Sequence, residues 1–402
     1  MTASEPAIAG QAPAPAFLRV GGALVARHQV ALALAAGCRR IVVIARDFTA
    51  EFASLQRDAE EAGASFHVVA AATGLTGLVT AADEVLALAE GLLPTPGDAL
   101  PLFASGQGVI VLPADHGTAA GFERIDLAQA WAGMMLVPGR LVDRLMDLPA
   151  DVDAVSALLR IALQAGVSLR PVPEAVRSGG RWLLIRNEVD AQAAEEGWMV
   201  RHTADGPGTP GPAMARLLVR HFGAAMLHEG SSRIIGLGLS GLLAILALAA
   251  GWFGSLVGGF ALLAAAEVVL GTSLLLVSLH QGALRQGPRR LWASGAAGVA
   301  FDLALVALLV LALPLLPGQT LAERGFPAVV LLGLLRVLPR VLPGRVMAWL
   351  EDRLVLTALF AVLAAGHVLA PAILGMSLVL LMAALVLIGR RDAAKATIIT
   401  GA

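Results

Sequence analysis

Hydrophobic residues follow two different patterns along this chain, and the change falls near Arg233. Before that point, short runs rich in Val, Ile and Leu alternate with stretches whose apolar residues recur at helical spacing. After it, the apolar runs lengthen towards the roughly 20 residues that a helix needs to cross hydrocarbon. The pattern predicts two domains, a soluble one followed by a membrane-embedded one.

The first half alternates predicted strands with predicted helices, starting at Phe17 after a lead (1–16) that we expect to be disordered. The expected strands are 39–47, 65–72, 83–94, 106–117 and 181–187, and the expected helices are 21–38, 48–64, 151–167 and 188–199. Asp151 is the expected N-cap of the third of these helices. This alternation is typical of a three-layer, Rossmann-like α/β domain with a mainly parallel sheet, here spanning 17–202.

Polar residues follow several of these strands. Asp47, Glu90 with Gly91, and Asp115 with His116 each come directly after an apolar run. Ligands of open α/β sheets bind beyond the carboxyl ends of the strands, so these positions are candidates for a binding site. The alternative, which the residues alone favour, is that they are ordinary solvated loop residues.

The stretch LRVGGALVARHQVALALAAGCRRIVVIA, at residues 18–45, resembles the nucleotidyltransferase family of the GT-A-like type. The resemblance covers roughly Phe17 to Met199 and implies CTP binding. Its candidate nucleotide-binding residues are Gly21, Gly22, Arg27, Glu90 and Asp115, and Glu90 is the candidate ligand for Mg²⁺. The family's glycine-rich phosphate loop and its lysine have no counterpart, because a Pro/Ala tail precedes Arg19 and Lys395 is the only lysine.

A Pro/Gly-rich linker, 203–212, separates the halves. A basic amphipathic helix is expected next, at 213–230, with Leu217 and Phe222 on one face and Arg216 and Arg220 on another. Its place directly before the hydrophobic spans favours a helix that lies at the membrane interface.

Six membrane spans are predicted within 231–390, followed by a tail at 391–402. They are 234–252, 254–279, 291–316, 326–342, 354–369 and 371–388. If both ends of the chain lie in the cytoplasm, the outside loops carry only Arg324 among basic residues. The inside loops and the tail carry Arg285, Arg289, Arg290, Arg340, Arg345, Arg353, Arg390, Arg391 and Lys395. This bias predicts a multi-pass protein of a bacterial inner membrane with both ends inside.

Two acids fall within the predicted spans. Glu267 lies near the middle of the second span, and Asp302 lies about eleven residues into the third. A charge at mid-bilayer costs roughly 2.5–3.5 kcal/mol on insertion scales, so each acid needs a reason. They either form a site inside the bundle or tie two helices together by hydrogen bonds.

The joint between the second and third spans resembles the signature of the CDP-alcohol phosphatidyltransferase family, D-x2-D-G-x2-A-R-x8-G-x3-D-x3-D. Arg289, Gly298 and Asp302 match it with the required spacing. The remaining five positions differ and are Gln281, Leu284, Arg285, Pro288 and Val306. In that family the acids bind divalent metals on the CDP pyrophosphate and the last Asp activates the attacking alcohol, so the resemblance implies Asp302 as a candidate catalytic residue and metal ligand. Glu267, which no signature position covers, is the second candidate catalytic residue, for a divergent enzyme. Arg285, Arg289 and Arg290 are candidates for binding phosphate or anionic lipid headgroups.

The order of the two domains resembles bifunctional inositol-phosphate cytidylyltransferase/phosphatidyltransferase proteins, whose members commonly dimerise through the bundle. With three of the four signature acids replaced, the first hypothesis is a lipid-pathway partner that has lost ordinary catalysis. A divergent transferase that uses CTP or a CDP-alcohol, and an ion-coupled transporter that uses Glu267 and Asp302, are the alternatives.

The composition of the chain narrows the possible classes of protein further. Hydrophobic residues make up 57% of the chain and charged residues 15%, which is too apolar for one soluble globule. The net charge of −1 gives no indication of nucleic-acid binding. A single cysteine, Cys38, forbids an internal disulfide and fits a reducing compartment.

Overall fold

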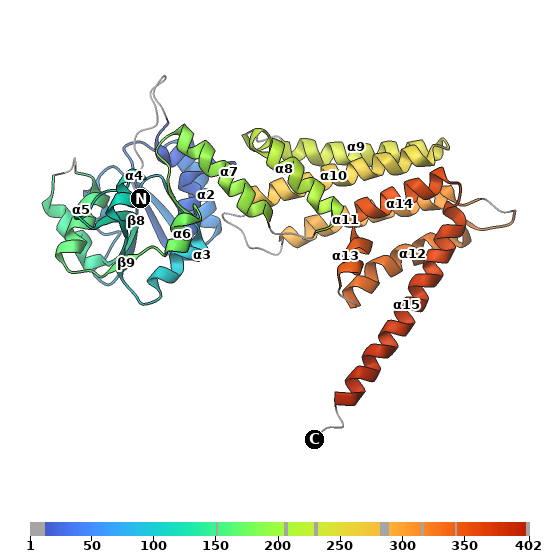
Figure 1. Ribbon diagram of the computed structural model, residues 1–402. Coiled ribbons are helices and arrows are strands. Elements are labelled where there is room, and N and C mark those ends of the chain that lie inside the picture. Colours follow the sequence, from blue (N-terminus) through green and yellow to red (C-terminus); the bar gives the residue numbers. More distant parts are fainter. Residues whose placement is uncertain are drawn as a thin grey trace. The chain divides into compact units, whose positions relative to one another are not determined.

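The computed structural model describes residues 13–149, 152–204, 208–228, 232–281, 289–314, 317–341 and 344–398. The chain divides into two compact units, and the main division falls between Arg201 and His202. The first unit is α/β and the second is helical (Figure 1), so the predicted change of fold class along the chain is confirmed.

Four of the strands of the α/β unit form one sheet in the order β5-β8-β7-β9. They are β5 (Glu84–Leu88), β8 (Gln129–Pro138), β7 (Gly108–Pro113) and β9 (Leu169–Pro171). β8 runs antiparallel to both β5 and β7, whereas β7 and β9 are parallel. The prediction of a mainly parallel sheet was wrong for this reason: the sequence did not predict β8, the ten-residue strand at the centre of the sheet.

The described residues of this unit contain three further pairs of strands. β3 (Arg40–Ile44) and β4 (Ser65–Val69) are parallel. The other two pairs are antiparallel: β1 (Arg19–Val20) with β2 (Ala23–Leu24), and β6 (Leu92–Pro94) with β10 (Trp182–Leu184).

The helices of this unit pack on the strands through separate apolar clusters. α1 (Val25–Ala35) and α2 (Ala50–Glu61) cover β3 and β4 through Val30, Phe52 and Leu55, all of which are buried. α5 (Ala154–Gln164) covers β7 and β8. The remaining helices are α3 (Pro96–Ala99), α4 (Ala114–Ala119), α6 (Glu174–Ser178) and α7 (Glu188–Ala204).

The N-cap of α5 is Asp153, whose side chain accepts a hydrogen bond from the Val155 amide at 3.1 Å. The prediction of Asp151 was wrong by two residues, and Asp151 itself lies outside the described residues. The helix begins where a carboxylate can reach the free amide groups of its first turn.

The second unit consists of eight helices in the part of it that the structure describes. They are α8 (Pro210–His228), α9 (Ser232–Trp252), α10 (Leu256–Gln281), α11 (Arg289–Ala312), α12 (Leu321–Val341), α13 (Arg345–Glu351), α14 (Arg353–Ala365) and α15 (Leu369–Ile398). The linker between α7 and α8 is shorter than predicted, because α7 continues to Ala204 and α8 begins at Pro210.

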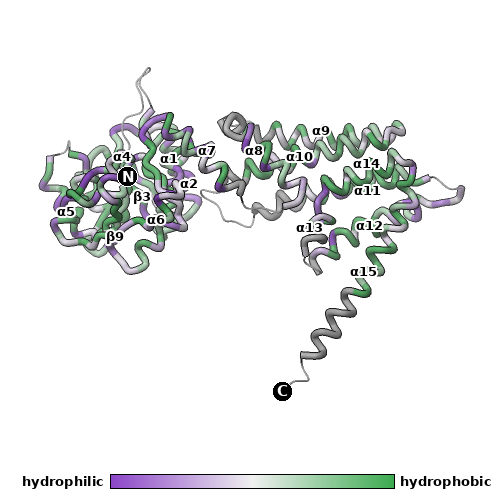
Figure 2. The backbone as a smooth tube through the Cα atoms, viewed as in Figure 1, coloured by the Kyte–Doolittle hydropathy of each residue, from purple (hydrophilic) through white to green (hydrophobic). Residues whose placement is uncertain are grey.

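Four of these helices are long and apolar enough to cross a membrane, and they contain 235–252, 256–277, 295–312 and 369–386. Figure 2 shows the dominance of apolar residues along α9, α10 and α11. The other two predicted spans are not confirmed. α12 carries Glu323, Arg324 and Arg336, and the 13 residues of α14 rise only about 20 Å at 1.5 Å per residue.

Candidate functional site

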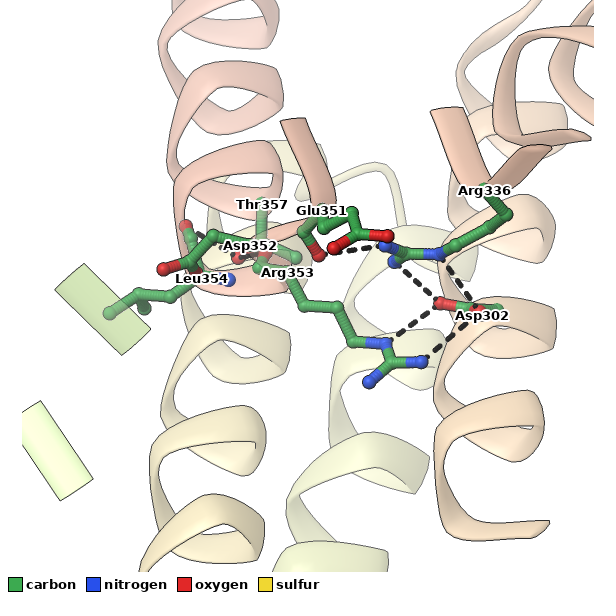
Figure 3. Close-up of polar contacts among 7 residues, drawn as sticks. All are labelled: Asp302, Arg336, Glu351, Asp352, Arg353, Leu354 and Thr357. Carbon is green, nitrogen blue, oxygen red and sulfur yellow. Dashed lines mark hydrogen bonds and ion pairs between the residues drawn. The ribbon is translucent and has the colours of Figure 1, made fainter. Parts of the chain in front are cut away.

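The carboxylate of Asp302 on α11 lies between two arginines from different helices (Figure 3). Arg336 of α12 donates from Nε to Oδ2 at 3.1 Å and from Nη2 to Oδ1 at 2.8 Å. Arg353 of α14 donates from Nε to Oδ1 at 2.9 Å and from Nη2 to Oδ2 at 3.3 Å. Each carboxylate oxygen thus accepts two charge-assisted hydrogen bonds, which are stronger than neutral ones. We call these three side chains the Asp302 cluster.

The break between α13 and α14 places Arg353 at this cluster. Asp352 ends α13 and caps α14, because its Oδ1 accepts hydrogen bonds from the amides of Leu354 at 2.9 Å and Val355 at 3.3 Å. Arg336 also donates from Nη1 to the Glu351 carbonyl oxygen at 2.7 Å, so it satisfies a backbone acceptor at the end of α13. The cluster therefore joins α11, α12 and the α13–α14 corner.

Gly298, one turn before Asp302, makes room for the Arg353 side chain. A methyl group at this position would lie 2.7 Å from Nη2 of Arg353. The guanidinium carbon of Arg353 lies 5.8 Å from the centre of the Phe301 ring, within cation–π range. The glycine of the signature spacing thus serves the approach of an arginine in this structure.

The arrangement does not fit a divalent cation at Asp302. A metal needs free carboxylate oxygens, whereas both oxygens of Asp302 already accept two hydrogen bonds each. The positive charges of the two guanidinium groups beside the carboxylate would also repel a metal cation. Within the described ranges, no three or more His, Cys, Asp or Glu side chains are grouped so that they can hold a metal.

Glu267, the second predicted catalytic residue, lies on α10 within electrostatic range of Arg353, Arg336 and Asp302. Its Oε2 atom is buried and has no hydrogen-bond partner among the described residues. The sequence analysis placed the two acids on neighbouring spans, and the structure brings both near the same pair of arginines.

Asp352 also connects this corner to α8. Its Oδ2 accepts a hydrogen bond from the Gly211 amide at 2.7 Å, and a methyl group on Gly211 would lie 2.7 Å from Oδ1. On α8, Ala215 and Val219 are buried, whereas Met214, Leu217 and Phe222 are exposed. The exposed apolar side chains agree with the predicted interfacial position of this helix, which stays a prediction.

A second candidate site lies in the α/β unit, where the carboxyl ends of β3, β4 and β5 surround a cavity of about 640 Å³. Its ionisable lining residues are Arg46, Glu90, Glu123 and Asp153. The hydroxyl of Ser156 lies 2.8 Å from Oε2 of Glu123 and 2.9 Å from Oδ2 of Asp153. Oε1 of Glu90 accepts a hydrogen bond from the Ala16 amide at 3.4 Å.

The structure brings only one of the predicted nucleotide-binding residues, Glu90, to this cavity. Asp115 is exposed at the start of α4 and is not part of the lining. Gly21 and Gly22 form the turn between β1 and β2, where their φ angles of 62° and 75° favour glycine. Arg27 forms an ion pair with Asp58 of α2 at 2.9 Å. Nucleotide binding by these residues stays a prediction.

Two groups of site residues were missed in the sequence. Arg336 and Arg353 were assigned to a span and to an inside loop, although a basic residue inside a predicted span is a signal for an acidic partner. Glu123 lies in a loop that carried no motif, and Asp153 was placed inside the expected helix 151–167 and not at its N-cap. The side chains of Arg285, Arg289 and Arg290 lie outside the described residues, so their predicted role at lipid headgroups stays a prediction.

No known protein family and no curated protein matches this chain. Fold and site therefore define its class: an α/β unit followed by a helical unit of membrane-protein type, with an acid held by two arginines between its helices.

Proposed function

We propose that this chain is an integral membrane protein of transferase-like architecture that acts as a lipid-pathway partner and does not itself transfer phosphatidyl groups. One observation carries the proposal: both oxygens of Asp302 are occupied by the guanidinium groups of Arg336 and Arg353. The fusion of a nucleotidyltransferase-like domain with a CDP-alcohol phosphatidyltransferase-like domain is part of this proposal, and it rests on the sequence resemblance.

The chemistry of phosphoryl transfer supports the loss of activity. Such transfer depends on metals that neutralise the developing charge and on a positioned base. In the signature family, Asp302 would be one of four signature acids, yet in this chain it is the only one of the four present, and it pairs with two arginines instead. The distribution of basic residues supports a location in a bacterial inner membrane with both ends of the chain in the cytoplasm. The amphipathic α8 would lie at the membrane surface.

The test uses the purified full chain in lipid nanodiscs. The protein is incubated with CDP-diacylglycerol, with Mg²⁺ or Mn²⁺, and with inositol phosphate or glycerol phosphate. No phosphatidyl-linked product should form, whereas an active transferase, the positive control, should form it. Incubation with CTP and the same phosphates should give no CDP-alcohol. Product in either reaction, lost in Asp302→Asn or Glu90→Gln respectively, would establish the alternative of a divergent transferase.

A retained ligand is compatible with this role. The cavity at the strand ends of the α/β unit is large enough for a small polar molecule, and Arg46 is its basic group. Calorimetric titration of the full chain with CTP, with and without Mg²⁺, measures whether nucleotide binds. Binding that Glu90→Gln weakens would assign CTP as a partner, and heat that is unchanged in this variant would place the ligand elsewhere.

Ion-coupled transport is the second candidate, because Oε2 of Glu267 is buried and accepts no hydrogen bond within the part of the chain that the structure describes. A carboxylate inside a bundle with an oxygen that accepts no hydrogen bond is the type of group that binds and releases protons. Proteoliposomes with an internal pH dye measure this directly. Proton flux that Glu267→Gln abolishes would favour transport over the first proposal.

A further inference from the structure

Arg201, near the end of α7, is a half-buried cation without an acidic partner. Within the described part of the chain, its side chain forms no hydrogen bond and no ion pair. Burial and the positive charge of Arg181 both lower the pKa of Arg201, so both effects oppose its charged form. An arginine stays charged in spite of such effects, and its position therefore requires an explanation.

Two glycines leave room for the Arg201 side chain. A methyl group on Gly197, one turn earlier in α7, would lie 3.1 Å from Nη1 of Arg201. A methyl group on Gly180 would lie 3.8 Å from the same atom, and the φ of Gly180 is 59°, which favours glycine. Glycine within a helix is less stable than alanine, so the space that Gly197 leaves has a use. The guanidinium group therefore lies beside the turn at residues 178–181.

Arg181 ends this turn, and the protein fixes its guanidinium group. Nη1 of Arg181 lies 3.2 Å from Oδ1 of Asp98, and Nη2 donates to the Ala175 carbonyl oxygen at 3.0 Å. The side chain of Arg181 is still 35% exposed, so a solute can reach it. Asp98 balances one of the two positive charges, and the charge of Arg201 remains.

Two guanidinium groups that the fold holds close together repel each other, and a bound anion would remove this repulsion. We propose that Arg181 and Arg201 form a binding site for a phosphate group at the 178–181 turn. Arg201 would bind it through two parallel hydrogen bonds, because all of its N–H donors are unused by the described residues.

The chemistry of the two arginines favours phosphate over a carboxylate. A phosphate group on a larger molecule offers three acceptor oxygens and up to about two negative charges, so it can accept from both guanidinium groups at once. The group could belong to an anionic phospholipid or to a soluble phosphate monoester. The site is separate from the 640 Å³ cavity, whose lining contains neither arginine.

The test titrates the full chain, in nanodiscs of phosphatidylcholine and in buffer free of phosphate and sulfate, with glycerol phosphate in a calorimeter. Arg201→Gln should weaken binding at least tenfold, because it removes the guanidinium group that has no other partner. Arg201→Lys keeps the charge but not the planar fork, so its affinity should lie between the two. Arg160→Gln is the matched control, since Arg160 is an exposed arginine on α5, and it should change the affinity less than twofold.

Thermal unfolding followed by circular dichroism separates binding from a structural role. Without phosphate, Arg201→Gln should unfold at the native midpoint or slightly above it, because the change removes a repulsion and no hydrogen bond. Glycerol phosphate should raise the midpoint of the native chain and of Arg160→Gln, but not that of Arg201→Gln. A lower midpoint of Arg201→Gln without phosphate, with no effect of glycerol phosphate on the native chain, would assign a purely structural role and overturn the proposal.

Nanodiscs in which phosphatidic acid replaces part of the phosphatidylcholine distinguish the two sources of the phosphate. A raised midpoint in these discs, absent in Arg201→Gln, would assign a lipid headgroup, whereas an effect of glycerol phosphate alone would assign a soluble ligand. Equal affinity of the native chain and Arg201→Gln, no binding by either, or binding that only Glu90→Gln weakens would overturn the proposal. None of these results depends on whether the chain transfers phosphatidyl groups.

Discussion

Removal of the Asp302 carboxylate should destabilise the helical unit strongly, because it leaves two guanidinium groups without their partner. The Asp302→Ala variant loses all four hydrogen bonds of the Asp302 cluster, from Arg336 and Arg353. Breaking a buried ion pair by removing one partner costs about 3–5 kcal/mol. The side chains of the cluster are 18–26% exposed, so water screens part of this effect and the lower end, about 3 kcal/mol, is expected.

Conservative variants separate charge from hydrogen bonding. Asp302→Asn keeps one acceptor oxygen and should cost about 1–2 kcal/mol. Arg336→Met and Arg353→Met each leave Asp302 one guanidinium partner, so each single change should cost less than Asp302→Ala. A double-mutant cycle between Asp302 and Arg353 should give a coupling free energy of about 1 kcal/mol or more.

The free energy of unfolding is measured in mixed micelles by titration with a denaturing detergent, with Trp fluorescence as the readout. The same titration is repeated with Mg²⁺, which should not change the stability of the native chain. A loss below about 0.5 kcal/mol for Asp302→Ala would refute a structural role for the cluster. Stabilisation by Mg²⁺ in the native chain and not in Asp302→Ala would show that Asp302 binds metal.

Three further changes test local features. Gly298→Ala should destabilise the helical unit by about 1–2 kcal/mol in the same detergent titration, because its methyl group displaces Arg353. Gly295→Ala on the same helix is the control: its methyl group meets no atom within 4 Å, so it should be neutral or slightly stabilising. Burial raises the pKa of the Cys38 thiol, so the rate of its alkylation at pH 8, followed by mass spectrometry, should be lower than that of a peptide thiol. The alkylation rate should also continue to increase above about pH 9. Asp153→Ala should cost about 1 kcal/mol in chemical denaturation and Asp153→Asn much less, because only alanine removes the helix cap; equal losses would contradict this.

Periodicity predicted most of the elements of the α/β unit but not its sheet topology. β3 (RIVVI) is a run of β-branched residues and β4 (SFHVV) combines an aromatic residue with two valines, which are strong signals for strands. β8 has the sequence QAWAGMMLVP, in which glycine and methionine replace most of the usual strand formers. Gly133 within it has a φ of 80°, beside the register shift between Val109 and Val111 of β7. Residues 129–138 form a strand because they pair with β5 and β7 on both sides, not because of their local strand propensity.

The candidate site could not be predicted in full, because its residues lie far apart in the sequence. Spacing alone selected Asp302, yet its partners lie 34 and 51 residues further along the chain. The positive charge of Arg353 fitted an inside loop equally well, so nothing local indicated its pairing. The same arginines explain why two of the six spans were not confirmed, since Arg336 interrupts the apolar pattern of α12 and Arg353 begins the short α14.

The spacing of Arg289, Gly298 and Asp302 is thus compatible with two arrangements around Asp302. In the family that the joint resembles, an acid near the glycine helps to hold metal. In this chain, the space above Gly298 admits a guanidinium, and two arginines give Asp302 the positive charge that a metal would give. A cation that entered would have to displace up to four charge-assisted hydrogen bonds and leave two arginines unpaired, each at a cost of several kcal/mol. The two arginines therefore support the proposed role without phosphatidyl transfer: acids introduced at Gln281 or Leu284 should not create a metal site while Arg336 and Arg353 remain.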